Sequence, residues 1–236
     1  MHDEKQARDD RQDELRLSCC ANAWPHRAKA VACKLVTIDV SYLGGRSLPG
    51  LSDLGPRICI IGPSNSGKST LARMIGGKTE LPVFHLDQLR YETGGFDTLR
   101  QENDFIADHA VLIARDEWVM DGNYSSCLAS RIDRATGLIL LECSMLRSLI
   151  RYVKRCRHAG TRAGGVPGLA SEPVRWTMLR HIIGPTRQNR QRYRLVFDAM
   201  TKPRLALLSP RAYRVFCQSE GLSFQGVSNG LVLRHD

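Results

Sequence analysis

The sequence lacks a hydrophobic run that could cross a membrane, because no stretch reaches the ~18 apolar residues that a spanning helix needs. Its first residues are charged and contain no apolar segment of the kind found in secretory signals. These two absences argue against a membrane protein and against a secreted one. We therefore expect a cytoplasmic protein with no membrane partner.

Cysteines are present, but they lack the spacing of a metal site. The eight cysteines include one adjacent pair, and the other six are scattered along the chain. Cys59 and Cys143 lie in apolar runs, which is typical of small buried hydrophobic residues. We do not expect a disulfide framework. The chain has 236 residues, of which 42% are hydrophobic, and it can therefore form an ordinary hydrophobic core.

Acidic residues are scarce in the C-terminal third. Residues 143–215 contain sixteen Lys and Arg against two acids, whereas residues 1–55 contain eight of each kind. The net charge of +10 therefore comes mainly from the C-terminal third. Such an excess suits either the phosphates of a nucleotide or the backbone of a nucleic acid.

The most informative motif lies in residues 57–70, where an apolar run precedes Gly62-x-x-x-x-Gly67-Lys68-Ser69. A strand, a glycine-rich loop and a helix in this order make a phosphate-binding loop, although a Gly/Ser turn can match by chance. The glycines allow the turns, and the backbone N–H groups form an anion nest at a helix N-terminus. Lys68 would contact the β- and γ-phosphates of ATP, and Ser69 the Mg²⁺. The residues expected to bind ATP are Gly62, Pro63, Ser64, Asn65, Ser66, Gly67, Lys68, Ser69 and Thr70.

From residue 57 onward, short apolar runs alternate with helical patterns. This alternation predicts an α/β fold in which a five-stranded parallel sheet is flanked by helices on both faces, and together with the phosphate-loop motif it resembles the three-layer sandwich of the P-loop NTPases with a small lid. We expect residues 56–236 to form this domain, with the lid at about 158–190, and residues 1–55 to be a poorly ordered extension. The predicted strands are 58–61, 81–86, 118–121, 138–141 and 204–208. The first predicted helix begins near Lys68 and ends at Gly76-Gly77.

Two predicted strands have an aspartate at or just after their ends, and parallel sheets bind ligands at the carboxyl ends of their strands. Asp121 closes the third strand, which is the pattern that positions Mg²⁺ opposite a phosphate loop. Asp87 follows the second strand, where it either orients the second substrate, holds a Mg²⁺-bound water or caps a helix. His85 lies within that strand, and we expect a core histidine there rather than a catalytic one.

The residues around the Asp121 turn are candidates for the substrate site. Gly122 lets the backbone approach a ligand closely. Asn123 and Tyr124 either contact the substrate or shape the turn.

Arginines recur at helical spacing after the fourth predicted strand. Arg147, Arg151 and Arg155 share one face of a helix, where three guanidiniums repel one another unless an anion faces them. They form either a triphosphate clamp, for which the planar guanidinium is well suited, or a solvated basic face. Arg187 and Arg190 follow a Gly-rich segment and could close onto the same phosphates, excluding water.

These motifs resemble those of the P-loop nucleotide kinases, broadly adenylate kinase and more closely the adenylate-kinase-like proteins of the DNA topology modulation (FlaR) type. The resemblance covers about 57–216, and Asp-Gly-Asn-Tyr at 121–124 is its most family-specific element. It implies ATP and Mg²⁺ as cofactors. It implies Lys68, Asp121, Arg151, Arg155 and Arg187 as catalytic residues, Ser69 and Asp121 as metal ligands, and Arg190 as an ATP contact. Arg131 is a candidate for the acceptor phosphate or a packing residue.

We therefore expect a kinase that transfers the γ-phosphoryl group of Mg-ATP to a nucleoside monophosphate or another small acceptor. The basic C-terminal third also suits an ATP-binding regulatory protein that makes weak nucleic-acid contacts without efficient turnover. A degenerate nucleotide-binding module is the third alternative. The segment between Asp87 and Trp118 is short compared with adenylate kinase, so the sequence does not identify the acceptor.

Overall fold

The computed structural model describes residues 49–92, 99–156, 174–184 and 186–223 of the chain. The chain divides into two units, Met1–Leu43 and Gly44–Asp236, and all described residues belong to the second. Most of the extension predicted at 1–55, and the Gly-rich part of the predicted lid, lie outside the described residues. None of the described helices is long and apolar enough to cross a membrane.

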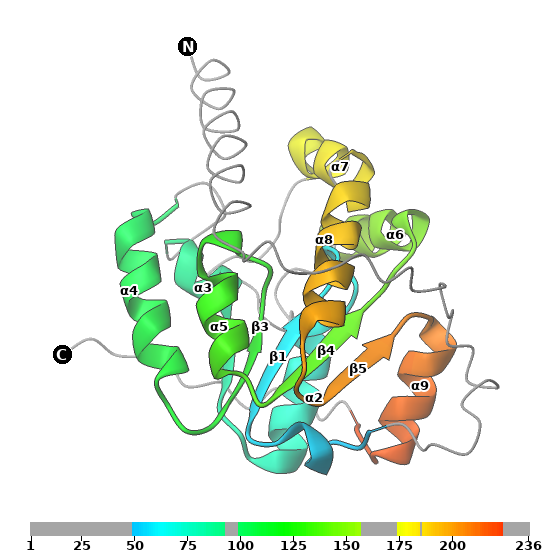
Figure 1. The fold of residues 1–236 in the computed structure, drawn as a ribbon. Coiled ribbons are helices and arrows are strands. Elements are labelled where there is room, and N and C mark those ends of the chain that lie inside the picture. The colour runs from blue at the N-terminus through cyan, green and yellow to red at the C-terminus, as the bar shows by residue number, and fades with distance from the viewer. Residues whose placement is uncertain (1–48, 93–98, 157–173, 185, 224–236) are drawn as a thin grey trace. The chain divides into compact units, whose positions relative to one another are not determined.

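Five parallel strands form one sheet in the order β2-β3-β1-β4-β5 (Figure 1). The central strand β1 pairs with β3 on one side and β4 on the other, and all three are buried along nearly their whole length. Burial on both faces explains why these strands are continuous apolar runs in the sequence. The predicted α/β fold with a five-stranded parallel sheet is confirmed. The strands are β1 Arg57–Ile61, β2 Val83–His85, β3 Trp118–Asp121, β4 Gly137–Leu141 and β5 Arg204–Leu207.

Helices cover both faces of this sheet. Alternate residues of each strand point to opposite faces, so Ile58 and Ile60 of β1 contribute to one core cluster and Cys59 and Ile61 to another. The first cluster is completed by α2 and α9, and the second by α3, α4, α5 and α8. The helices are α2 Lys68–Thr79, α3 Leu86–Arg90, α4 Glu102–Ile113, α5 Leu128–Arg134, α6 Met145–Cys156, α7 Trp176–Ile183, α8 Thr186–Ala199 and α9 Pro210–Ser219, with 3₁₀ turns η1 Ser52–Leu54 and η2 Ser125–Cys127.

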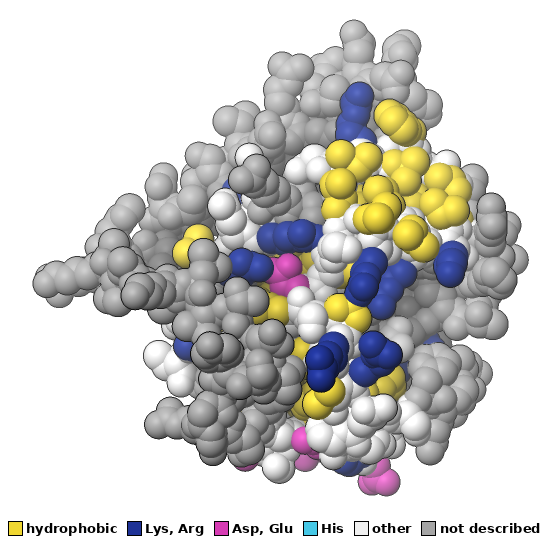
Figure 2. Space-filling view, turned by 90° about the vertical axis from the view of Figure 1, so that its right-hand side faces the viewer, with side chains coloured by type: hydrophobic (Ala, Val, Ile, Leu, Met, Phe, Trp, Pro, Cys, Tyr) yellow, Lys and Arg dark blue, Asp and Glu magenta, His cyan; other side chains and the backbone are white. Residues whose placement is uncertain are grey.

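Helices α6 and α7 pack on each other through a small third cluster centred on Tyr152, whose hydroxyl accepts the backbone N–H of Arg175 at 2.9 Å. They lie beyond the carboxyl ends of the strands (Figure 1). Both helices also expose hydrophobic side chains, and Figure 2 shows such side chains gathered beside a group of Lys and Arg. The exposed hydrophobic residues of the two helices are Met145, Leu146, Ile150, Trp176 and Ile183.

The predicted end of the first helix at Gly76-Gly77 is wrong. Helix α2 continues to Thr79 and ends at Glu80, which has a left-handed conformation with φ 59°. A Cβ at Gly76 would lie 2.2 Å from a methyl carbon of Val83. This glycine therefore allows the helix to pack closely against β2 rather than ending it.

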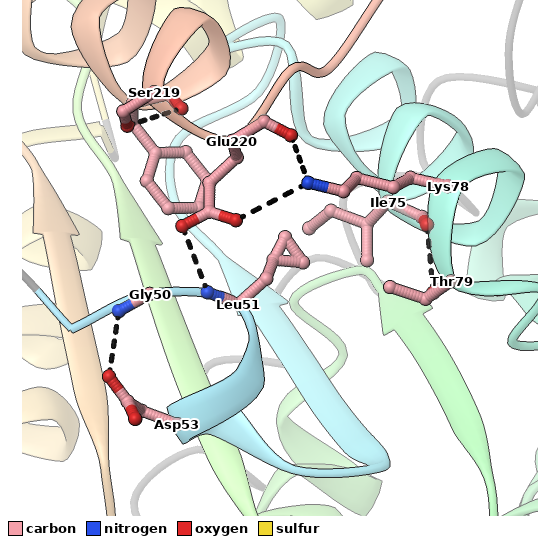
Figure 3. A network of polar contacts seen from close by, with 9 residues as sticks. Gly50, Leu51, Asp53, Ile75, Lys78, Thr79, Ser219 and Glu220 are labelled. Atoms are coloured by element: carbon pink, nitrogen blue, oxygen red, sulfur yellow. Dashed lines mark hydrogen bonds and ion pairs between the residues drawn. The ribbon is translucent and has the colours of Figure 1, made fainter.

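The folded domain begins earlier than the predicted residue 56. Leu51 and Leu54 are buried in the first core cluster. Glu220 secures this segment, because its side chain accepts the N–H of Leu51 at 3.2 Å (Figure 3). Lys78 binds the backbone carbonyl of the same Glu220, and its Nζ lies 3.6 Å from the Glu220 Oε2. Residues 49–55 are thus part of the packed domain, contrary to the expected extension.

We expect Leu54→Ala to lower the free energy of unfolding by about 3 kcal/mol, because it leaves a cavity under a fully buried side chain. Chemical denaturation followed by circular dichroism measures this change. Leu195→Ala is the matched control, since Leu195 is 68% exposed on α8. Equal stability of the two variants would show that residues 49–55 do not support the core.

Helix α4 buries His109 one turn after Phe105, with 6.4 Å between their ring centroids. Burial, together with the nearby Arg131 guanidinium, lowers the pKa of His109 from its ordinary 6.5 to about 4. As pH falls below 6.5, His109 therefore becomes protonated in the unfolded chain while it stays neutral in the folded chain. The stability that this site contributes is complete above pH 6.5 and is lost as pH falls toward 4.

We expect His109→Leu to make the domain less sensitive to acid. Between pH 7 and pH 4 the wild-type chain should lose about 3 kcal/mol more stability than the variant, on the basis of the lowered pKa. Urea unfolding at several pH values measures the difference. Parallel pH profiles for the two proteins would contradict a depressed pKa at His109.

Candidate active site

The phosphate loop of residues 62–67 connects β1 to α2 at the carboxyl edge of the sheet. Three of its residues have positive φ, namely Gly62 at 143°, Asn65 at 60° and Gly67 at 105°. A Cβ at Gly62 would lie 2.2 Å from the carbonyl oxygen of Leu141 at the end of β4, so only glycine fits at this position beside β4. The strand, curled loop and helix that the motif predicts are therefore all present.

Lys68, the first residue of α2, folds back over this loop. Its Nζ donates to the carbonyl oxygens of Gly62 and Pro63, both at 2.9 Å. These bonds hold the ammonium group against the first turn of the loop. A cation in this position can attract an anionic phosphate to the loop.

Asp121 and Ser69 meet at the other end of the loop. The Ser69 hydroxyl donates to Asp121 Oδ2 at 2.6 Å, and His85 Nδ1 contacts Asp121 Oδ1. Burial alone would raise the pKa of Asp121. The neighbouring His85, Ser69 and Lys68 outweigh that effect and lower it. Asp121 is thus a buried carboxylate with its negative charge retained.

This pair fits a magnesium ion that is shared with a nucleotide. Mg²⁺ prefers oxygen ligands and usually combines one or two protein groups with phosphate oxygens and waters. The Ser69 hydroxyl and the Asp121 carboxylate are such groups, and they already lie within hydrogen-bonding distance of each other. Among the described residues, no cluster of three or more His, Cys, Asp or Glu could bind a metal by itself.

The turn after Asp121 brings together several predicted substrate residues. Gly122 has φ 135°, and a Cβ there would lie 2.7 Å from the Cβ of Leu86. The Asn123 amide bonds to the phosphate loop, because its Oδ1 accepts the N–H of Gly62 at 3.2 Å and its Nδ2 donates to the Gly62 carbonyl at 2.6 Å. Tyr124 points the other way, and its hydroxyl donates to Asp87 Oδ1 at 2.8 Å.

The position of Arg131 favours the packing alternative over the acceptor phosphate. Its side chain is fully buried, and Nη2 donates to the Gly122 carbonyl at 2.7 Å. The buried guanidinium supports the turn at Gly122 from inside the protein. In this structure it is not exposed to an acceptor substrate.

The predicted arginine clamp is brought together in part. Arg151 reaches the phosphate loop, where Nη1 donates to the carbonyls of Ser66 at 2.7 Å and Asn65 at 3.3 Å. Arg190 instead donates to the carbonyl of Cys143, just after β4. The side chains of Arg155 and Arg187 lie outside the described part of the structure.

Sequence reasoning missed a hollow of about 190 Å³ beside the end of β4. It is lined by Glu142, Arg190, Gln191 and Arg194. Arg194 Nε lies 3.0 Å from Glu142 Oε1, so two of the lining residues form an ion pair. The sequence contains a partial signal, since the acidic Glu142 directly follows the buried strand β4, much as Asp121 is the last residue of the buried strand β3.

The sequence predicts only a core role for His85. The side chain is buried as predicted, but its Nδ1 also contacts the carboxylate of Asp121. The register of the parallel pair β2–β3 places His85 directly opposite Asp121. That register was the missing information.

Comparison with known proteins yields similar structures but no family. No protein-family model and no curated protein matches the chain. Shikimate kinase from Acinetobacter baumannii is similar with 14% identity and a TM-score of 0.42, over 75% of this chain and 100% of that chain. A gluconokinase from Sinorhizobium meliloti 1021 has 15% identity and a TM-score of 0.39, over 75% and 91%. Shikimate kinase from Aquifex aeolicus vf5 has 15% identity and a TM-score of 0.38, over 70% and 96%.

Proposed function

We propose that this chain is a cytoplasmic kinase that transfers the γ-phosphoryl group of Mg-ATP to a small acceptor. The observation that carries the proposal is the bond between Ser69 and Asp121 at the phosphate loop. A hydroxyl from the start of α2 and a carboxylate from the end of β3 form the metal-binding half of a nucleotide site. The Asp-Gly-Asn-Tyr element at 121–124 supports membership of the adenylate-kinase-like proteins of the DNA topology modulation type.

The donor half of the site would act mainly through position and charge. Backbone N–H groups of the loop and Lys68 would hold the phosphates, and Arg151 lies at the same loop. When bound, Mg²⁺ would be held by Ser69 and Asp121 and would neutralise charge on the β- and γ-phosphates. Phosphoryl transfer needs little covalent help from protein groups, which is consistent with a site of this composition.

The acceptor half would lie at the end of β2, next to Asp121. Asp87 is two residues beyond His85, the register partner of Asp121, and it is half-buried. A carboxylate in this place can accept a hydrogen bond from an acceptor hydroxyl and orient it toward the donor phosphate. Tyr124 donates to the same carboxylate and would fix its direction.

The alternative is an ATP-binding protein associated with nucleic acid, which the net charge of +10 supports. Several arginines of the basic third, however, already bond to backbone carbonyls. Arg190 binds Cys143, and Arg204 binds the carbonyls of Asp198 and Met200. Part of the positive charge therefore satisfies polar groups at the ends of strands and helices, which weakens the nucleic-acid alternative.

The proposal is tested by ADP release from ATP and Mg²⁺ in the presence of AMP, other nucleoside monophosphates and small alcohols. We expect acceptor-dependent release that falls at least about 100-fold in Lys68→Ala, since a preorganised charge at the transferred group is lost. Arg73→Ala removes a cation from the same helix and should retain activity. A purified chain that binds no ATP would refute the proposal, and binding without turnover on any acceptor would favour the degenerate module.

We expect Asp87→Asn to reduce kcat/KM for the acceptor by about tenfold or more, because a charged hydrogen-bond partner is lost. The KM for ATP should stay unchanged. Tyr124→Phe should produce a smaller effect of the same kind, and Asp133→Asn, at an exposed position of α5, is the matched control. Steady-state kinetics with an acceptor that supports ADP release in that screen measures these changes. An unaltered acceptor KM and kcat in Asp87→Asn would remove Asp87 from the acceptor site.

A further inference from the structure

We infer that Asn123 is a positioning residue of the phosphate loop, whose side-chain amide fixes Gly62 and thereby sets the affinity of the loop for nucleotide phosphates. The inference rests on the proposed function only for the identity of the ligand. The contacts themselves are properties of this structure. They place Asn123 at the phosphate loop, whereas the sequence leaves open whether it contacts a substrate or shapes the turn.

The amide of Asn123 continues the sheet beyond the end of its strand. The pairing of β1 with β3 ends at Ile60 and Asp121, and the β3 chain then turns away at Gly122. Gly62 therefore loses a backbone partner on that side. Asn123 replaces it, since Oδ1 accepts the Gly62 N–H at 3.2 Å and Nδ2 donates to the Gly62 carbonyl at 2.6 Å.

Only a side chain with a donor and an acceptor side by side can make both bonds. The primary amide of asparagine has this pair at the required length. Aspartate keeps an acceptor for the N–H but places a second oxygen against the Gly62 carbonyl. Leucine has a similar size and makes neither bond.

The peptide that carries Asn123 is itself held in place. The buried Arg131 donates to the Gly122 carbonyl at 2.7 Å, and Gly122 packs against Leu86. The amide thus belongs to a turn that is supported from α5 and α3. Such support lets a single side chain keep a fixed direction.

The two ends of the loop are braced by residues only two positions apart. Asn123 binds Gly62 at the start of the loop, and Asp121 binds Ser69 just after its end. Lys68 adds a third contact, to the Gly62 carbonyl that Asn123 also binds. A loop held at both ends has less conformational freedom to lose when phosphate binds, so we expect the brace to contribute to affinity.

The test is ATP binding to the full chain, measured by calorimetry with Mg²⁺, for Asn123→Asp and Asn123→Leu. Losing the two bonds should weaken ATP binding by about 10- to 100-fold. Inorganic tripolyphosphate should lose affinity by the same factor, because the loop contacts only phosphates. Asn103→Asp makes the same chemical change at an exposed position of α4 and should bind as the wild-type chain does.

Leu54→Ala separates positioning from general stability, since it should lower stability while leaving the Kd for ATP unchanged. Amide hydrogen exchange without nucleotide gives a second readout, and it should become faster at residues 62–70 in the Asn123 variants. If Asn123→Asp or Asn123→Leu does not fold, Asn123→Ser is a smaller change on which the same binding and exchange measurements can be made.

The outcomes distinguish the two claims. A wild-type chain that binds no ATP refutes the proposed function, and faster exchange in the Asn123 variants would still support the brace. Asn123 variants that bind ATP within about twofold of the wild-type chain, with unchanged exchange at residues 62–70, overturn the inference while the proposed function stands.

Discussion

The parallel pairing of β1 with β3 is the constraint on which the site depends. It places Asp121 opposite Ile60, so that one strand ends where the other continues into the phosphate loop. The Ser69–Asp121 and Asn123–Gly62 bonds both follow from this register. Both strands are buried on both faces, so a shift by one residue would exchange the side chains of the two faces and disrupt their close packing against the helices on each side.

The sheet and the loop could be predicted because β1, β3 and β4 are buried apolar runs, and because a glycine directly follows β1 and an aspartate closes β3. The pattern reports that a residue is buried or at a strand end, but not which atoms it meets. Gly76 therefore looked like a helix end, although its lack of a side chain serves contact with Val83. For the same reason the pattern leaves open whether Asn123 and Arg131 contact a substrate or support the turn, and the structure shows that they bind Gly62 and Gly122.

The charge of the chain illustrates the same limit. Helical spacing placed three arginines on one face of α6, and that spacing alone suits a phosphate clamp and a solvated surface equally. The structure adds a contact for one of the three, because Arg151 bonds to carbonyls of the phosphate loop. Arg190 bonds to the end of β4 instead. Sequence gives the sign and periodicity of charge, while the partner of each guanidinium depends on the tertiary structure.

The four residues from Asp121 to Tyr124 connect the two halves of the site. Asp121 and Asn123 bind the donor loop, while Tyr124 binds Asp87 on the proposed acceptor side. Gly122, between them, is fixed by the buried Arg131. A displacement of this turn would therefore move the proposed metal ligand Asp121, the loop brace Asn123 and the Tyr124 contact with the proposed acceptor carboxylate together. Such coupling gives a physical reason for a short, closely supported turn at this position, since in-line phosphoryl transfer requires both substrates to keep one relative geometry.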